Sequence, residues 1–190
     1  SQMNYGSNSG RQETGLETKF VAFDQVATVA DDGRIEGYAS LFGVADASGD
    51  VVEEGAFAAS LRRMREASRS VKLLWQHDPG EPIGVWDLVR EDERGLRVSG
   101  RLMTEVRRGA EALALLRAGA VDGLSIGYRA VKAGRSPHGG RSLLEVELWE
   151  VSLVTFPMLP EARASAAVAD AEEDAFEAAL AEALSEARGR

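Results

Sequence analysis

The sequence predicts an α+β domain built on a mostly antiparallel β-barrel of about seven strands with flanking helices. Short apolar segments separated by turn-forming residues recur from residue 20 to residue 156, a pattern typical of β-strands. Two segments with helical periodicity, 55–67 and 104–119, interrupt the strands in an irregular order. Because strands and helices do not alternate regularly, a doubly wound parallel sheet is not expected.

The first strands are expected to pair antiparallel. Apolar and β-branched residues gather at 20–23, 26–29 and 34–42, and Asp31-Asp32-Gly33 marks a turn before the last of these segments. A loop of turn-forming residues, 46–50, follows them.

Three acidic residues, Asp46, Asp50 and Glu53, lie close together in and after this loop. Carboxylates this near one another could hold a cation. No Glu stands at the closing position that a calcium-binding helix–loop–helix loop requires, however. We therefore expect a solvated loop.

The middle of the chain is expected to hold a helix and three strands. In 55–67 the apolar residues fall near one helical face and the arginines on the other. Strand 71–76 leads into the turn Asp78-Pro79-Gly80. Segments 83–89 and 96–103 then predict a hairpin or meander joined by a charged turn.

The second helix is bounded by capping residues. Thr104 is the expected N-cap, Glu105 stands in the first turn, where the helix dipole favours a carboxylate, and Gly119 ends the helix. Strands are expected at 126–131 and 143–155, with a polar loop between them.

Composition divides the chain into three parts. Residues 1–18 are polar and are expected to form a disordered leader. Residues 19–160 contain the predicted strands and core helices, and thus the folded domain. Residues 161–190 are rich in Ala and Glu and are expected to form an acidic helical tail. A narrow apolar stripe runs along this tail: Phe176, Leu180 and Leu184.

Charge and residue content exclude several classes of function. The net charge is −9; residues 161–190 hold eight acids and three bases, a net of −5, which leaves −4 for residues 1–160. Neither part has the basic surface that nucleic-acid binding requires, so no nucleic-acid partner is expected. With two histidines and no cysteine, disulfides and thiolate chemistry are excluded, and neither a metal nor a cofactor is expected. No segment approaches the roughly 20 apolar residues of a membrane span, so no membrane partner is expected.

The string Gly123-Leu124-Ser125-Ile126-Gly127 places one hydroxyl between two glycines. It matches the G-x-S-x-G pattern of the nucleophile elbow, which needs a strand before the serine and a helix after it. Here the order is helix, turn and then Ser125 at the start of a strand. An α/β-hydrolase fold is therefore rejected. Ser125 stays a candidate nucleophile, and the alternative is a small residue in a tight turn.

A serine hydroxyl needs a neighbouring imidazole to take its proton. His77 stands at the end of an apolar strand, where it can project from a rigid scaffold, and it is the better candidate base. The alternative for His77 is a residue that merely caps a turn. His138, in a polar loop, is expected at the surface.

A third group must orient the imidazole and stabilise its cation. Glu145 and Glu147 share the polar face of an alternating strand and are expected to face solvent. Glu150 interrupts that alternation in its most apolar part, where a carboxylate needs a partner. Asp78 competes, but its adjacency to His77 on an extended chain points it away. Glu150 is the candidate, with Asp78 and Glu147 still open.

At this point five motifs between residues 35 and 160 resemble the prohead maturation proteases of tailed phages with HK97-type capsids and of the related gene transfer agents. Their joint order and spacing carry the resemblance. The motifs are Gly37-Tyr38-Ala39-Ser40-Leu41-Phe42; Gly49-Asp50-Val51-Val52 with Gly55-Ala56-Phe57; Leu74-Trp75-Gln76-His77-Asp78 with Pro82-Ile83-Gly84; Gly123-Leu124-Ser125-Ile126-Gly127-Tyr128; and Glu150-Val151-Ser152-Leu153-Val154-Thr155-Phe156-Pro157.

The resemblance implies a serine endopeptidase whose protease domain, 19–160, has the fold of the herpesvirus assemblins, a β-barrel wrapped by helices. In that fold the base, the nucleophile and the third member follow one another along the chain, an order that His77, Ser125 and Glu150 match. The assemblins use a second histidine as the third member, whereas this chain has Glu150 at the comparable place.

The resemblance also implies substrates and a setting. The substrates are the scaffolding segment of the major capsid protein and the protease itself, cut inside the procapsid in the host cytoplasm. A homo-oligomer is expected, with a dimer as the first candidate, because assemblins are activated by dimerisation. Oxyanion donors are expected just after the third member, and since Pro157 has no N–H, the candidates are Met158 and Leu159.

Two other functions stay open from the sequence. A non-catalytic capsid-assembly or scaffolding module on the same barrel would leave His77 and Ser125 structural, and the acidic Ala/Glu-rich tail favours it. A general cytoplasmic hydrolase would act on small esters or peptides without any capsid partner.

Overall fold

The computed structural model describes residues 16–22 and 27–155 of the 190-residue chain. Most of the expected leader, the expected oxyanion donors Met158 and Leu159 and the acidic tail 161–190 lie outside these residues. The first strand begins at Glu17, so residues 17 and 18, which were expected in the leader, are part of the sheet.

The described part of the chain forms nine strands and two helices. No helix within residues 16–22 and 27–155 is long and apolar enough to cross a membrane. In chain order the elements are β1 (Glu17–Ala22), β2 (Ala27–Val29), β3 (Arg34–Leu41), β4 (Val51–Val52), α2 (Ala58–Glu66), β5 (Lys72–Trp75), β6 (Asp78–Glu91), β7 (Gly95–Leu102), α3 (Arg107–Arg117), β8 (Gly123–Arg135) and β9 (Arg141–Val154).

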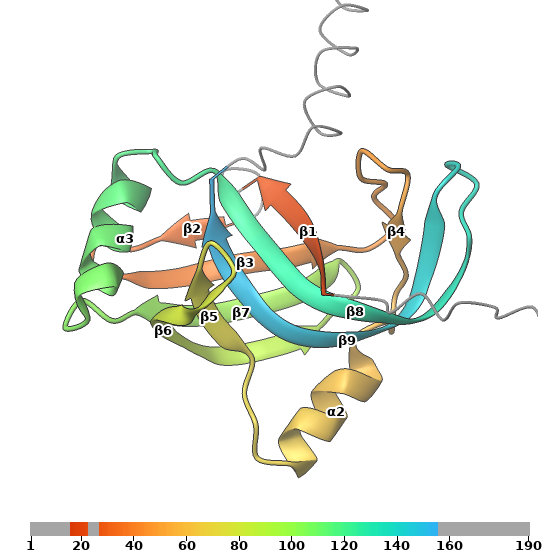
Figure 1. Ribbon diagram of the computed structural model, residues 1–190, viewed down its shortest axis with the longest axis horizontal. Helices are drawn as coiled ribbons and strands as arrows, with labels where there is room; N and C mark the ends of the chain where they lie inside the picture. Colours follow the sequence, from red (N-terminus) through yellow and green to blue (C-terminus); the bar gives the residue numbers. More distant parts are fainter. Residues whose placement is uncertain (1–15, 23–26, 156–190) are drawn as a thin grey trace, which may run out of the picture.

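The strands form one sheet in the order β1-β8-β9-β5-β6-β7-β3-β2, with β4 added beside β9. Every pairing is antiparallel except those of β9 with β4 and with β5. Figure 1 shows that the sheet curls into a half-barrel, with β8 and β9 running together as a long hairpin. The predicted α+β fold, mostly antiparallel with flanking helices, is confirmed.

The two helices cover different parts of the sheet. Helix α3 packs against β6 and β7, and α2 packs against β9 and β6 (Figure 1). Helix α2 and the turn before it are fixed to β9 by two polar contacts. The N–H of Val146 donates to the carbonyl of Ala56, just before the helix, at 3.0 Å, and the N–H of Leu148 donates to Oγ of Ser60 in the helix at 2.9 Å.

The core lies inside the curl of the sheet and contains alternate residues of the long strands, such as Leu124, Ile126 and Tyr128 of β8. In β9 the alternation is broken by a bulge: Gly127 of β8 pairs with Glu150, but the next residue, Tyr128, pairs with Leu148. Trp149 is therefore skipped, and Trp149 and Glu150 both lie outside the core. The core members of β9 are Leu143, Val146, Leu148, Val151 and Leu153.

Three local predictions were wrong. Thr104 does not cap α3, because residues 103–106 form a turn and the helix begins after Val106, whose side chain makes no cap hydrogen bond. The first helix starts at Ala58 rather than near Gly55. The regular alternation expected in strand 143–155 also fails near its start, where Leu143 belongs to the core and Leu144 is 43% exposed, because the β8–β9 ladder has register shifts.

The acidic loop 46–50 carries ion pairs instead of facing only solvent. Burial alone would raise the pKa of Asp46, but the Lys19 ammonium, 2.7 Å from its carboxylate, and the Ser48 hydroxyl hold that pKa below its ordinary value. Asp50 binds the Arg141 guanidinium, with Nη2 and Oδ2 2.7 Å apart. These two carboxylates are thus neutralised by neighbouring bases from β1 and β9.

Candidate active site

Ser125 is the third residue of β8 and lies between two neighbouring strands. It pairs with Phe20 of β1 and with Ser152 of β9. Its neighbours Leu124 and Ile126 belong to the core, so the Ser125 side chain lies on the opposite, outer face of the sheet. Ser125 is only 3% exposed, so its hydroxyl is held in a fixed environment.

Both glycines around Ser125 are required by packing. A Cβ on Gly123 would overlap the carbonyl oxygen of Val21 and the ring of Phe20. A Cβ on Gly127 would overlap the carboxyl group of Glu150, which lies over it. The G-x-S-x-G string therefore has a physical basis here that is unrelated to a nucleophile elbow. This reason for the two glycines lies in the neighbouring strands and is not visible in the string itself.

His77 lies in a tight turn between β5 and β6. Gln76 and His77 have φ angles of 52° and 62°, the left-handed region that residues other than glycine seldom occupy. Two contacts with β9 hold the turn: the N–H of Gln76 donates to the carbonyl of Leu153 at 3.0 Å, and the N–H of His77 donates to Oγ of Ser152 at 3.1 Å. Such strained backbone is typical of functional sites.

The turn brings the His77 ring between Ser125 and Glu150. Nε2 of His77 is 2.9 Å from Oγ of Ser125, and Nδ1 forms a direct hydrogen bond with Oε1 of Glu150. A carboxylate beside Nδ1 favours the tautomer that carries its proton there, which leaves Nε2 to accept a proton from the serine hydroxyl. Glu150 is 5% exposed, and its buried carboxylate has the partner that the sequence analysis required.

Ser152 completes this set of contacts and is a site residue that was not predicted from the sequence. Its hydroxyl donates to Oε2 of Glu150 at 2.6 Å while it accepts the backbone N–H of His77. Ser152 is fully buried, and its Oγ touches two of the three candidate residues. The available signal was a hydroxyl on the polar face of an apolar strand, two residues after Glu150.

The competing carboxylates lie elsewhere. Oδ1 of Asp78 accepts the N–H of Gly80 at 2.8 Å at the start of β6, so the turn expected at Asp78-Pro79-Gly80 is wrong: these residues begin a strand, and the turn lies at Gln76 and His77. Glu147 forms an ion pair with Arg129 across the β8–β9 ladder, with Oε2 and Nη2 2.7 Å apart. Neither of these carboxylates is hydrogen-bonded to His77.

Two further side chains, Tyr128 beside the string and His138 in the turn after β8, can be assigned to other roles. Burial raises the pKa of the Tyr128 phenol, with a contribution from the charge of Glu17, so this residue of β8 stays neutral and is no candidate base. His138 is exposed in the turn between β8 and β9, as expected.

The arrangement is a carboxylate, an imidazole and a hydroxyl joined in series on the outer face of the sheet. This series of contacts can activate a serine hydroxyl for attack on a carbonyl carbon. The contributing elements are the β5–β6 turn for His77, β8 for Ser125 and β9 for Glu150 and Ser152.

Comparisons with known proteins point to one family. Residues 22–177 match the family described as caudovirus prohead serine protease. The chain is 34% identical over 146 residues to the prohead protease of Enterobacteria phage HK97, which covers 73% of this chain and 64% of that protein. It is also 34% identical over 99 residues to the capsid polyprotein of Pseudomonas phage PAJU2, which covers 48% of this chain and 15% of the polyprotein.

A solved structure shares the fold. The capsid assembly protease of bacteriophage T4 superimposes with a TM-score of 0.58 at 14% identity, covering 75% of this chain and 98% of that chain. At this identity the likeness concerns the fold alone.

Proposed function

This chain belongs to the caudovirus prohead serine protease family, and from that premise we propose that it is a serine endopeptidase that cuts the scaffolding segment of the major capsid protein, and itself, during procapsid maturation. The observation that carries the proposal is the placement of Nε2 of His77 2.9 Å from Oγ of Ser125, with Glu150 on the other ring nitrogen. A purely structural histidine has no need of both contacts in this order.

In the proposed mechanism Ser125 attacks the scissile peptide carbonyl while Nε2 of His77 takes the hydroxyl proton. His77 then gives this proton to the leaving amine, and a water that His77 activates hydrolyses the acyl-enzyme. Glu150 orients the imidazole and stabilises its cation. We propose that backbone N–H groups of Met158 or Leu159, outside the described residues, bind the oxyanion.

We assign Ser152 the role of a positioning residue. Its hydroxyl fixes the second oxygen of Glu150 and the backbone of His77 at once. A buried carboxylate that uses both oxygens in hydrogen bonds has little freedom to rotate, so the Glu150–His77 contact is set before substrate binds.

The proposed partners follow from the family. A segment similar to this chain forms part of a capsid polyprotein in phage PAJU2, which supports a capsid protein as the partner. The proposed site of action is the interior of the procapsid, in the host cytoplasm. The expected homo-oligomer, with a dimer as the first candidate, stays a prediction that sedimentation at several protein concentrations tests.

The test is to co-express the protein with its capsid protein precursor and to measure cleavage by intact-mass spectrometry. The parent and a Ser99→Ala control, changed on β7, are expected to cut the precursor, whereas Ser125→Ala is not. Cleavage by Ser125→Ala would exclude Ser125 as the nucleophile. An intact precursor with the parent, together with no labelling of Ser125 by a fluorophosphonate, would favour a non-catalytic capsid-assembly module. Turnover of small esters without precursor cleavage would favour a general hydrolase.

A further inference from the structure

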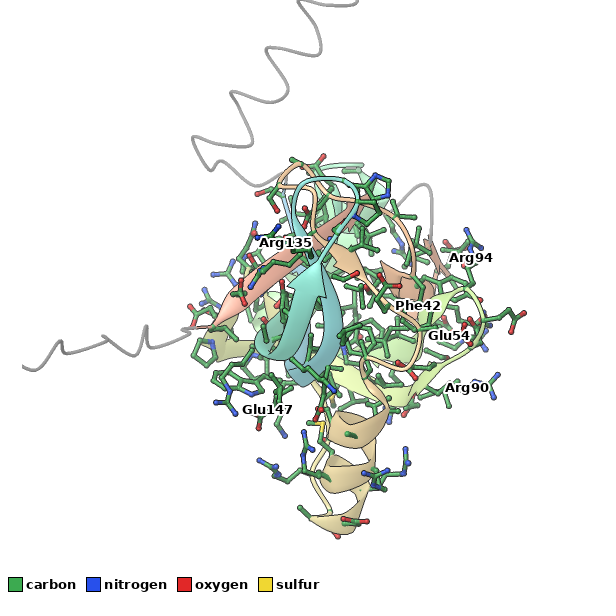
Figure 2. All side chains as sticks on the ribbon, turned by 90° about the vertical axis from the view of Figure 1, so that its right-hand side faces the viewer. Phe42, Glu54, Arg90, Arg94, Arg135 and Glu147 are labelled. Carbon is green, nitrogen blue, oxygen red and sulfur yellow. The ribbon has the colours of Figure 1, made fainter. Side chains whose placement is uncertain are left out.

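A second surface feature lies beside the candidate active site. It is a groove of about 480 Å³ between α2, β5 and β9. Its lining combines cationic side chains, among them Arg69 and Lys72, with the apolar side chains of Met64 and Trp149. Figure 2 shows Glu147, another lining residue, beside α2 where the helix joins the sheet.

The groove has unbalanced positive charge. Among the described residues, Arg69 and Lys72 take part in no ion pair and no side-chain hydrogen bond. The negative charge of Glu147 is already neutralised by Arg129. The segment 62–72 contains five basic residues and one acidic residue in a chain whose net charge is −9. This local surface therefore attracts an anionic partner.

The groove also offers an exposed aromatic side chain. Trp149 is 44% exposed, because the bulge in β9 turns it away from the core. An exposed tryptophan beside unpaired cations suits an amphipathic acidic segment, which can bury apolar side chains on the ring and place carboxylates on the bases.

We propose that this groove binds the acidic C-terminal segment of the same chain, residues 161–190. That segment holds eight acids against three bases, so its charge is opposite to that of the groove. Phe176 and Leu180 recur at helical spacing and can pack on Trp149, while neighbouring carboxylates such as Glu173 face Arg69 and Lys72. Binding of the tail would neutralise the bases of the groove and cover its exposed apolar side chains.

The chain length permits this contact. The described chain ends at Thr155, and the stretch from Leu148 of β9 to Thr155 spans about 23 Å at a rise of ~3.3 Å per residue. Residues 156–171 reach as far as about 50 Å when extended, so the segment can return to the groove. Attachment to the same chain gives the tail an effective concentration on the order of millimolar, which favours its own groove over that of another copy.

The test uses the full chain with Ser125→Ala, so the measurement does not depend on proteolysis or on the proposed function. The chain has no cysteine, so Ala67→Cys at the end of α2 and Ser185→Cys in the tail give two unique sites for spin labels. Pulsed dipolar spectroscopy then measures the distance between the labels. The labelled protein is diluted with an excess of unlabelled protein, so that only distances within one chain are detected.

A narrow distance distribution is expected at low salt. The double variant Arg69→Glu/Lys72→Glu and 0.5 M salt should each replace it with a broad one, because both weaken the charge pairing. The further changes Glu172→Lys and Glu173→Lys in the double variant should restore the narrow distribution. Arg90→Glu/Arg94→Glu is the control, since both residues lie away from Glu147 in Figure 2, and it should change nothing.

Three outcomes would overturn the proposal. A broad distribution in the parent at low salt would show that the tail is not bound. A narrow distribution that survives charge reversal in the groove would place the tail elsewhere. A narrow distribution that is seen only in a second, undiluted sample of the labelled protein would show that the groove binds the tail of a second copy.

Discussion

Gly127→Ala should disable the candidate site without touching any group that is proposed to react. A Cβ at Gly127 would lie 2.8 Å from Cδ and 3.0 Å from Cγ of Glu150, and ordinary contact begins at 3.4 Å. The carboxyl group must therefore retreat by at least about 0.6 Å, which breaks its alignment with the His77 ring. A misplacement of this size in a catalytic group costs on the order of 100-fold in rate, so we expect kcat to fall by about that factor. KM should change little, because the substrate does not contact Glu150 in the proposed mechanism.

The assay compares Gly127→Ala with Gly134→Ala. Both glycines belong to β8, but a Cβ at Gly134 has no neighbour within 4 Å, so any loss caused by an alanine in the strand as such appears in both variants. Steady-state cleavage of a peptide that contains the capsid site gives kcat and KM, and thermal unfolding shows whether each variant is folded. Parent-like kcat in a folded Gly127→Ala protein would refute the argument that the position of the Glu150 carboxylate controls the site.

Three further predictions concern neighbouring groups. Ser152→Ala removes the hydroxyl that holds Glu150, so it should lower kcat by about 10-fold to 100-fold with KM unchanged. Ser152→Thr keeps a hydroxyl and should retain most of the activity. Equal losses in both variants would contradict a positioning role. Glu150→Gln should lower kcat by on the order of 10²-fold to 10⁴-fold, because an amide does not stabilise the imidazolium. Glu147→Gln serves as the matched control and should keep the parent activity. A fully active Glu150→Gln enzyme would mean that another carboxylate orients His77. The pKa of Asp46 is lowered in the folded state, so its ionised carboxylate stabilises the folded protein at pH values above 3.8, the ordinary pKa of the group. This stabilisation is lost as the pH falls through the lower pKa of the folded state. Asp46→Asn should therefore lower the free energy of unfolding by about 1 kcal/mol at pH 7 and by progressively less as the pH falls below 3.8, as measured by denaturant titration. A loss that does not change with pH would contradict the ionic origin.

The arrangement of the candidate site was partly accessible from sequence because the chain offers few groups for acid–base chemistry. With two histidines, one of them in a polar loop, His77 was the evident partner for Ser125. Glu150 was singled out because it interrupts an apolar alternation, and the structure shows why it does so. The bulge at Trp149 shifts the register, so a charged residue falls where a simple period of two predicts the core.

The remaining features depend on tertiary contacts that local patterns do not encode. Ser152 is an ordinary strand residue by composition, and its role is visible only when the His77 turn is placed over β9. The lost cap at Thr104 has a similar cause, because the contacts of Met103 with β6 and with Val106 fix a turn where a helix was expected to begin. Gly127 likewise has no room for a Cβ because the Glu150 carboxyl group of the neighbouring strand lies over it, which the string itself does not reveal.

The contact between Gln76 and Thr155 has a mechanical consequence. The Gln76 amide donates to the hydroxyl of Thr155 at 3.1 Å and accepts the backbone N–H of Thr155 at 3.3 Å. Thr155 follows the last strand residue, and Gln76 directly precedes His77 in the turn. A pull on the chain beyond Thr155 is therefore transmitted through two hydrogen bonds to the residue next to the imidazole. Tension in the connection that follows Thr155 is therefore expected to change the alignment of the His77 ring with Ser125.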